Sequence, residues 1–150
     1  MLFDFLVWLV KALASYLAII IVFAIVVGLP IAIFDHFRFK RLVRKRAGLS
    51  ICQFARSFDC RHVDTRIIRA VYEALQGWTS SGIKQFPIMA VDDLNKVYGL
   101  KDEDLDDFAE NLAQAAKRGW TDLERNPLYG KVTTAKDLVL FLNFQPKQTG

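Results

Sequence analysis

Residues 12–34 read ALASYLAIIIVFAIVVGLPIAIF, a run of 23 residues without a charged side chain. At 1.5 Å per residue, a helix of this length extends about 35 Å, which is enough to cross the hydrocarbon core of a bilayer. The chain has 150 residues and is 53% hydrophobic, and this run holds the excess of apolar residues. It therefore predicts a transmembrane helix that divides the chain into an anchor and a more polar remainder.

A basic stretch, HFRFKRLVRKR at 36–46, follows the apolar run directly, whereas only Lys11 precedes it. A cleaved signal peptide has the opposite order, so the pattern favours an uncleaved anchor over a signal peptide or a buried core helix. Loops rich in Lys and Arg stay on the cytoplasmic side. We therefore predict a single-pass protein of the inner (cytoplasmic) membrane, with its N-terminus outside and its C-terminal domain cytoplasmic. Whether residues 1–11 enter the bilayer stays open.

The distribution of charge separates three segments. Residues 1–46 contain seven Lys or Arg against two Asp, a net charge of +5, whereas residues 47–150 contain thirteen against fourteen acids, a net charge of −1. The high isoelectric point thus belongs to the membrane-proximal stretch, which argues against a nucleic-acid partner. We predict an anchor at 1–35, a basic juxtamembrane linker at 36–50 and a cytoplasmic helical domain at 51–150. The residues predicted to contact the membrane surface are Arg38, Lys40, Arg41, Arg44, Lys45 and Arg46.

Three potential metal ligands occur as C-x7-C-x-H, namely Cys52, Cys60 and His62. This spacing differs from the paired C-x2-C and H-x3-H arrangements of structural zinc sites. Thiols in the cytoplasm are kept reduced. We therefore predict neither a metal site nor a disulfide here, and no cofactor elsewhere.

Apolar residues recur at helical spacing in five segments after the linker, and no segment shows the alternation of a strand. The fold class is therefore all-α, with an N-terminal transmembrane helix followed by a small helical bundle. Asp64, Asp102 and Thr134 are the expected N-caps, and Asp137 completes a capping box with Thr134. Glycines and a basic turn mark the helix ends. The five expected helices cover 51–58, 65–78, 89–98, 102–116 and 134–144, with Gly77, Gly99 and 117–119 as their stops.

Six carboxylates lie within KDEDLDDFAENL at 101–112. Those in the first turn are explained by the positive end of the helix dipole. Asp106, Asp107 and Glu110 lie further along and gain less from it. They are either an ordinary solvated face or a docking surface for a basic protein partner, and both interpretations stay open. The cluster lacks the glycine of an EF-hand loop, so calcium is not predicted.

The order of these segments resembles the acyl carrier protein family over about residues 64–145. In such carriers a D-S-L motif opens the second helix, and its serine bears phosphopantetheine. The matching residues here are Glu103-Asp104-Leu105 followed by Asp106, and GKVTTAKDLVLFL at 130–142 looks like the family's final helix. The resemblance implies an acyl-carrier-like bundle with an acidic helix that meets basic patches on partner proteins.

One departure from the family decides the chemistry that the resemblance implies. Asp104 stands at the position of the modified serine, and a carboxylate cannot form the phosphodiester that a hydroxyl makes. We therefore expect a membrane-anchored, non-enzymatic interaction module that docks a protein partner, such as a subunit of a membrane complex. The alternative is a protein that holds a lipid or acyl chain non-covalently at the membrane. An enzyme is the third choice, because neither histidine lies in a recognisable catalytic motif.

Overall fold

The computed structural model describes residues 2–79 and 86–148. These residues form helices and contain no β-strand, only two isolated bridges. The predicted helical class, with one apolar helix at the N-terminus, is therefore confirmed for the described residues. The chain divides into two compact units, residues 1–45 and residues 46–150. The helices are α1 (Leu2–Lys45), α2 (Ile51–Ala55), α3 (Thr65–Trp78), α4 (Leu94–Tyr98), α5 (Asp102–Ala115), the 3₁₀ helix η1 (Leu123–Arg125) and α6 (Ala135–Phe144).

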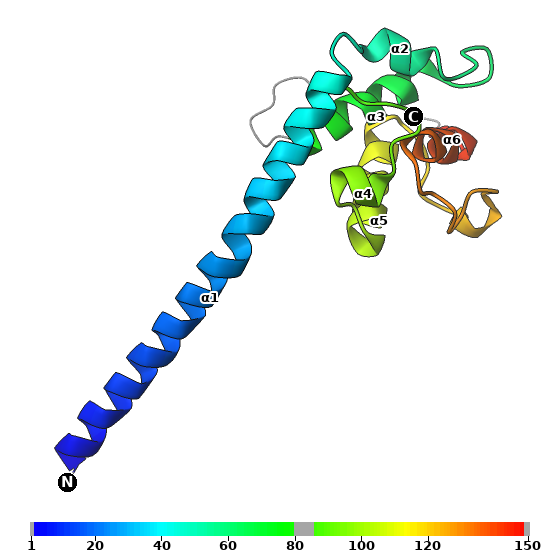
Figure 1. The fold of residues 1–150 in the computed structure, drawn as a ribbon. Helices are drawn as coiled ribbons and strands as arrows, with labels where there is room; N and C mark the ends of the chain where they lie inside the picture. Colours follow the sequence, from blue (N-terminus) through cyan, green and yellow to red (C-terminus); the bar gives the residue numbers. More distant parts are fainter. Residues whose placement is uncertain (1, 80–85, 149–150) are drawn as a thin grey trace. The chain divides into compact units, whose positions relative to one another are not determined.

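The first unit is the single helix α1, which Figure 1 shows as one continuous coil. Its 44 residues extend about 66 Å at 1.5 Å per residue. The segment Lys11–Pro30 has a mean hydropathy of 2.8, and none of its residues is buried. This segment is long and apolar enough to span a membrane, a test that signal sequences also pass. The helix continues to Lys45 and so includes the first ten residues of the predicted linker.

The second unit is a helical bundle centred on α3, which packs against α2, α5 and α6, while α5 also packs against α6 (Figure 1). Each helix contributes the apolar face that its periodicity predicts. α3 buries Ile67, Ile68, Val71 and Leu75, and α6 buries Leu138, Val139 and Leu142. Burial of such side chains is the main force that holds helices of this length in place.

The starts of α3 and α6 have the caps that the sequence predicts. Asp64 accepts a hydrogen bond from the backbone N–H of Arg66 at 2.9 Å. Thr134 accepts one from the N–H of Asp137 at 3.2 Å, and the Asp137 carboxylate accepts from the N–H of Thr134 at 2.9 Å. This reciprocal pair is a capping box, so both predicted caps are confirmed.

Several helix boundaries differ from the predictions. α2 ends at Ala55, three residues before the expected end, and Gly77 lies inside α3 instead of ending it. The segment 89–93 is not helical, because its carbonyls accept hydrogen bonds from the start of α6: the Ala135 N–H donates to the carbonyl of Asp92 at 2.9 Å and the Lys136 N–H to that of Ala90 at 2.8 Å.

α5 ends at Ala115, one residue before the expected end, and its stop is the first residue of the predicted 117–119 and not Gly119. Lys117 adopts a left-handed conformation (φ 53°), with the Arg118 N–H bonded to the carbonyl of Ala113 at 2.7 Å. This geometry is a Schellman motif in which lysine takes the position that usually holds glycine.

A buried polar cluster joins the ends of three helices. The guanidinium of Arg118, after α5, donates to the Asp64 carboxylate at 3.1 Å and to the carbonyl of Gln145 at 3.1 Å. Asn143 of α6 accepts from the Asp64 N–H at 3.0 Å and donates to the carbonyl of His62 at 3.0 Å. These bonds fix the beginning of α3 against the far ends of α5 and α6.

Candidate functional site

The acidic residues of α5 lie on the side of the helix that faces away from the bundle. Ala109, Leu112 and Ala113 are buried, and the ring of Phe108 packs edge-on against Trp78 with centroids 5.5 Å apart. The outward side carries the predicted docking residues, which we call the acidic face: Asp106, Asp107 and Glu110. The first two are exposed and the third is half-buried.

The acidic face is one continuous patch, because residues three and four apart are neighbours on a helix. Glu110 is four residues from Asp106 and three from Asp107, so it is a neighbour of both and links them. Among the described residues, these carboxylates form no ion pair within 4 Å. The structure thus places the three predicted residues together and leaves their charges unneutralised by a salt bridge.

The first turn of α5 carries the acid at the position that the carrier family uses for its serine. Asp104 is exposed there, and Lys101 is the N-cap, without a side-chain capping bond. The prediction of Asp102 as N-cap is therefore wrong by one residue, since the helix already includes it. Exposed carboxylates in this turn interact favourably with the positive end of the helix dipole.

A groove adjoins the acidic face between α5, η1 and α6. It has a volume of about 350 Å³, and most of its lining residues are apolar, with Asp106 and Tyr129 among the exceptions. Its wall is held by Asn126, which donates to the carbonyl of Phe141 at 2.9 Å and accepts from the N–H of Leu128 at 3.0 Å. The remaining lining residues are Leu105, Ala109, Trp120, Leu123, Tyr129, Gly130, Val132 and Leu138. The sequence gives little sign of this groove, because half of its wall comes from an aperiodic connection.

The basic residues predicted at the membrane surface do not share one environment. Lys40, Arg41, Arg44 and Lys45 are exposed on α1, and the side chain of Arg38 lies outside the described residues. Arg46 belongs to the second unit and has a side chain only 16% exposed. It makes an ion pair with Asp92, which no local sequence pattern indicates.

The carboxylate of Asp92 is almost fully buried and has four hydrogen-bond donors. The guanidinium of Arg46 contacts its two oxygens at 2.7 and 2.8 Å. The N–H of Met89 donates at 2.9 Å and the hydroxyl of Tyr98 at 3.0 Å. Burial, and then the negative charge of Asp92, raise the pKa of the Tyr98 phenol well above its ordinary value. Tyr98 therefore stays protonated and remains a donor to Asp92.

The three potential metal ligands of the sequence lie at the surface near α2. Cys52 and Cys60 are free thiols and both are exposed. The Nδ1 atom of His62 lies 2.7 Å from the carboxylate of Asp59, an exposed pair. Among the described residues, no group of three or more His, Cys, Asp or Glu side chains is arranged to hold a metal ion.

Comparison of this chain with models of known protein families, with curated proteins and with solved structures gives no match.

Proposed function

We propose that this protein is a membrane-anchored, non-enzymatic interaction module. In this proposal α1 holds the chain in the inner membrane with the bundle in the cytoplasm, and the acidic face of α5 docks a basic protein partner. The observation that carries the proposal is that Asp106 and Asp107, which are exposed, and Glu110, which is half-buried, have no ion-pair partners among the described residues.

The anchor is supported by the surface of α1. Every residue of the segment Lys11–Pro30 is unburied, although the segment has a mean hydropathy of 2.8. An exposed apolar surface of this kind is costly in water and favourable in lipid. The basic residues that follow it favour a cytoplasmic bundle.

The likeness to a degenerate acyl carrier protein is part of the same proposal. It is supported by three mutually packed helices, α3, α5 and α6, in the order that the resemblance implies. Asp104 at the position of the carrier serine excludes a phosphopantetheine arm there. A carrier-like fold that lacks the arm keeps a docking helix without the thioester chemistry.

The test is a triple charge reversal, D106K/D107K/E110K, in the full chain purified in detergent. The variant is expected to lose capture of the partner from membrane extracts while its Tm does not fall. The matched control, E73K/D122K/E124K, reverses three exposed carboxylates elsewhere on the bundle and is expected to retain capture. Equal capture by both variants and the wild type would show that the acidic face has no docking role.

A second candidate function is supported by the groove beside the acidic face. Its volume of about 350 Å³ lies within the range of sites for small ligands, and its walls are mostly apolar. We infer that this groove is the site of any non-covalently bound lipid or acyl chain, as an alternative to partner docking.

Native mass spectrometry of the full chain tests this alternative. Lipid bound to α1 would also give an adduct, so the variant Leu123→Lys is needed, because Leu123 lines the groove and not the anchor. An adduct that disappears in Leu123→Lys supports the groove as its site. An adduct that persists, or none at all, removes the support for lipid handling.

A further inference from the structure

A second charged surface lies on the bundle, at α2, the following turn and the start of α3. Its members are Arg56, Arg61, Arg66 and Arg69, which we call the arginine face. All four side chains are exposed. None of them has an ion pair within 4 Å among the residues that the structure describes.

The four arginines come from segments that lie against one another. The thiol of Cys60 contacts the carbonyl of Ala55 at 3.9 Å, which brings the turn that holds Arg61 back to the end of α2. Arg66 and Arg69 line one groove between α3 and α5. The other polar residues of this groove are Glu73 and Asn111.

The aspartates among the arginines already have partners. Asp59 is bound to His62 at 2.7 Å, and Asp64 is bound to the buried Arg118 at 3.1 Å. Residues 56–69 contain four Arg and these two Asp. The exposed side of this segment therefore carries an excess of positive charge.

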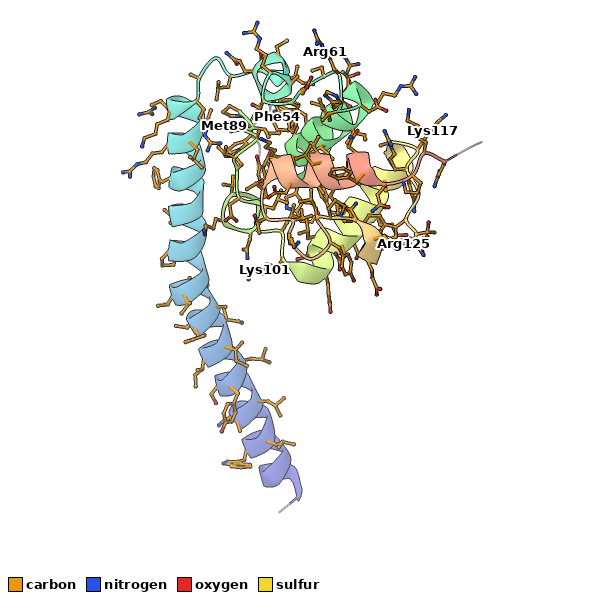
Figure 2. All side chains as sticks on the ribbon, turned by 90° about the vertical axis from the view of Figure 1, so that its right-hand side faces the viewer. Phe54, Arg61, Met89, Lys101, Lys117 and Arg125 are labelled. Carbon is orange, nitrogen blue, oxygen red and sulfur yellow. The ribbon has the colours of Figure 1, made fainter. Side chains whose placement is uncertain are left out.

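Arg61 and the beginning of α5 lie at opposite ends of the bundle. Figure 2 places Arg61 at the top of the second unit and Lys101, the N-cap of α5, at its lower edge. Residues 47–150 carry a net charge of only −1, so the positive charge of the arginine face is a local excess.

We propose that the arginine face binds the anionic phospholipid headgroups of the membrane that holds α1. The proposal rests on the proposed membrane anchor. Guanidinium groups bind phosphates with two parallel hydrogen bonds, and anionic leaflets attract basic segments close to the surface. The opposite charges of the face and the leaflet identify lipid as the occupant.

The chain length allows this contact. The apolar run ends at Phe34, so the last eleven residues of α1 extend at most about 16 Å beyond the hydrocarbon core. The headgroup layer occupies about 5 to 8 Å of that length. Only residues 46–50 separate α1 from α2. The bundle therefore begins on the order of one Debye length, about 8 Å, from the charged surface.

The test uses the full chain in lipid nanodiscs, with a fluorophore on Cys60 beside Arg61. Cys52 is also exposed and is replaced by serine so that labelling is specific. Energy transfer to a headgroup dye is compared in phosphatidylcholine discs and in discs of equal phosphatidylcholine and phosphatidylglycerol. We expect closer approach in the anionic discs, with loss of the difference at high salt.

The quadruple variant R56Q/R61Q/R66Q/R69Q is expected to lose this approach, with about a fivefold weaker contact for each arginine removed. The control K96Q/K101Q/R125Q/K131Q removes the same charge elsewhere on the bundle, and circular dichroism checks that both variants fold. The proposal would be overturned if energy transfer did not change with phosphatidylglycerol. It would also be overturned if the control variant lost the approach to anionic discs as fully as the quadruple variant. Binding of a DNA duplex in phosphatidylcholine discs that the quadruple variant abolishes would overturn it as well, because it would assign the face to nucleic acid. A chain that does not remain in the discs would instead refute the anchor.

Discussion

The ion pair between Arg46 and Asp92 is expected to be a major contribution to the stability of the bundle. The substitution Arg46→Met removes the cation and keeps a side chain of similar length. It leaves the Asp92 carboxylate, whose side chain is 1% exposed, with only the Met89 N–H and the Tyr98 hydroxyl as donors. A buried charge then lacks its counter-ion.

The size of the effect follows from the burial of the pair. Charges whose centres lie about 4 Å apart attract by about 4 kcal/mol at an effective dielectric constant of about 20, against about 1 kcal/mol in water. Removal of one partner from a buried pair costs about 3 to 5 kcal/mol. Because the Arg46 side chain is still 16% exposed, we expect Arg46→Met to lower the free energy of unfolding by about 3 kcal/mol.

Denaturant unfolding of the full chain in detergent, followed by the fluorescence of Trp78 and Trp120, measures this loss. A double-mutant cycle with Asp92→Asn separates the pair from its surroundings. The amide in Asp92→Asn carries no charge and is stabilised less by the guanidinium. Arg46→Met is therefore expected to lower the free energy of unfolding much less in the Asp92→Asn background. A cost below about 1 kcal/mol in the wild-type background would place the pair among weak surface salt bridges and refute the reasoning.

Three further predictions concern local structure. Thr134→Ala removes half of the α6 capping box and should lower the free energy of unfolding by about 1 kcal/mol, measured in denaturant. Gly99→Ala places a side chain at φ 73° and should lower the free energy of unfolding by about 1 kcal/mol. Gly77→Ala, inside α3, should raise the free energy of unfolding by about 0.5 to 1 kcal/mol. Neither added methyl meets another atom within 4 Å, so the two variants differ only in backbone conformation. Burial raises the pKa of the Asp137 carboxyl, but its hydrogen bonds from Thr134 and Thr133 together lower it by more, so the pKa is depressed. A depressed carboxyl pKa contributes stability above the unfolded pKa and loses it as the pH falls through the folded pKa, so stability should fall as the pH drops below about 3.9, and less steeply in Asp137→Asn.

Local patterns predicted the parts of the fold that depend on local physics. In the caps of α3 and α6, one side chain accepts a hydrogen bond from a backbone N–H no more than three residues away. Asp64 and Thr134 could therefore be identified from spacing alone. The apolar segment Lys11–Pro30 was equally evident from composition. The stop of α5 was predicted within 117–119, but the left-handed residue is Lys117 and not the expected Gly119, because a lysine in this conformation has no distinctive sequence signal.

Long-range contacts could not be predicted in this way. The sequence contains two adjacent aspartates, of which Asp93 caps α4 while Asp92 turns inward to Arg46, 46 residues earlier. Nothing local distinguishes these two roles. For the same reason Arg46 was grouped with the lipid-facing basic residues. The three residues of the acidic face could be placed together from the sequence, because they share one helix, while their docking role stays a prediction.

Stability does not account for the acidic face, whereas the docking role that we propose would. The first-turn acids of α5 gain from the helix dipole, but Asp106, Asp107 and Glu110 lie beyond the first turn, where that effect has faded. Like charges three and four residues apart destabilise a helix by about 0.2 to 0.5 kcal/mol per pair, and Glu110 makes such pairs with both aspartates. A helix selected for stability alone would place a lysine at residue 110, four residues after Asp106, and gain at both positions. The triple charge reversal is therefore not expected to weaken the fold, so a loss of partner capture in that variant would report on the surface itself.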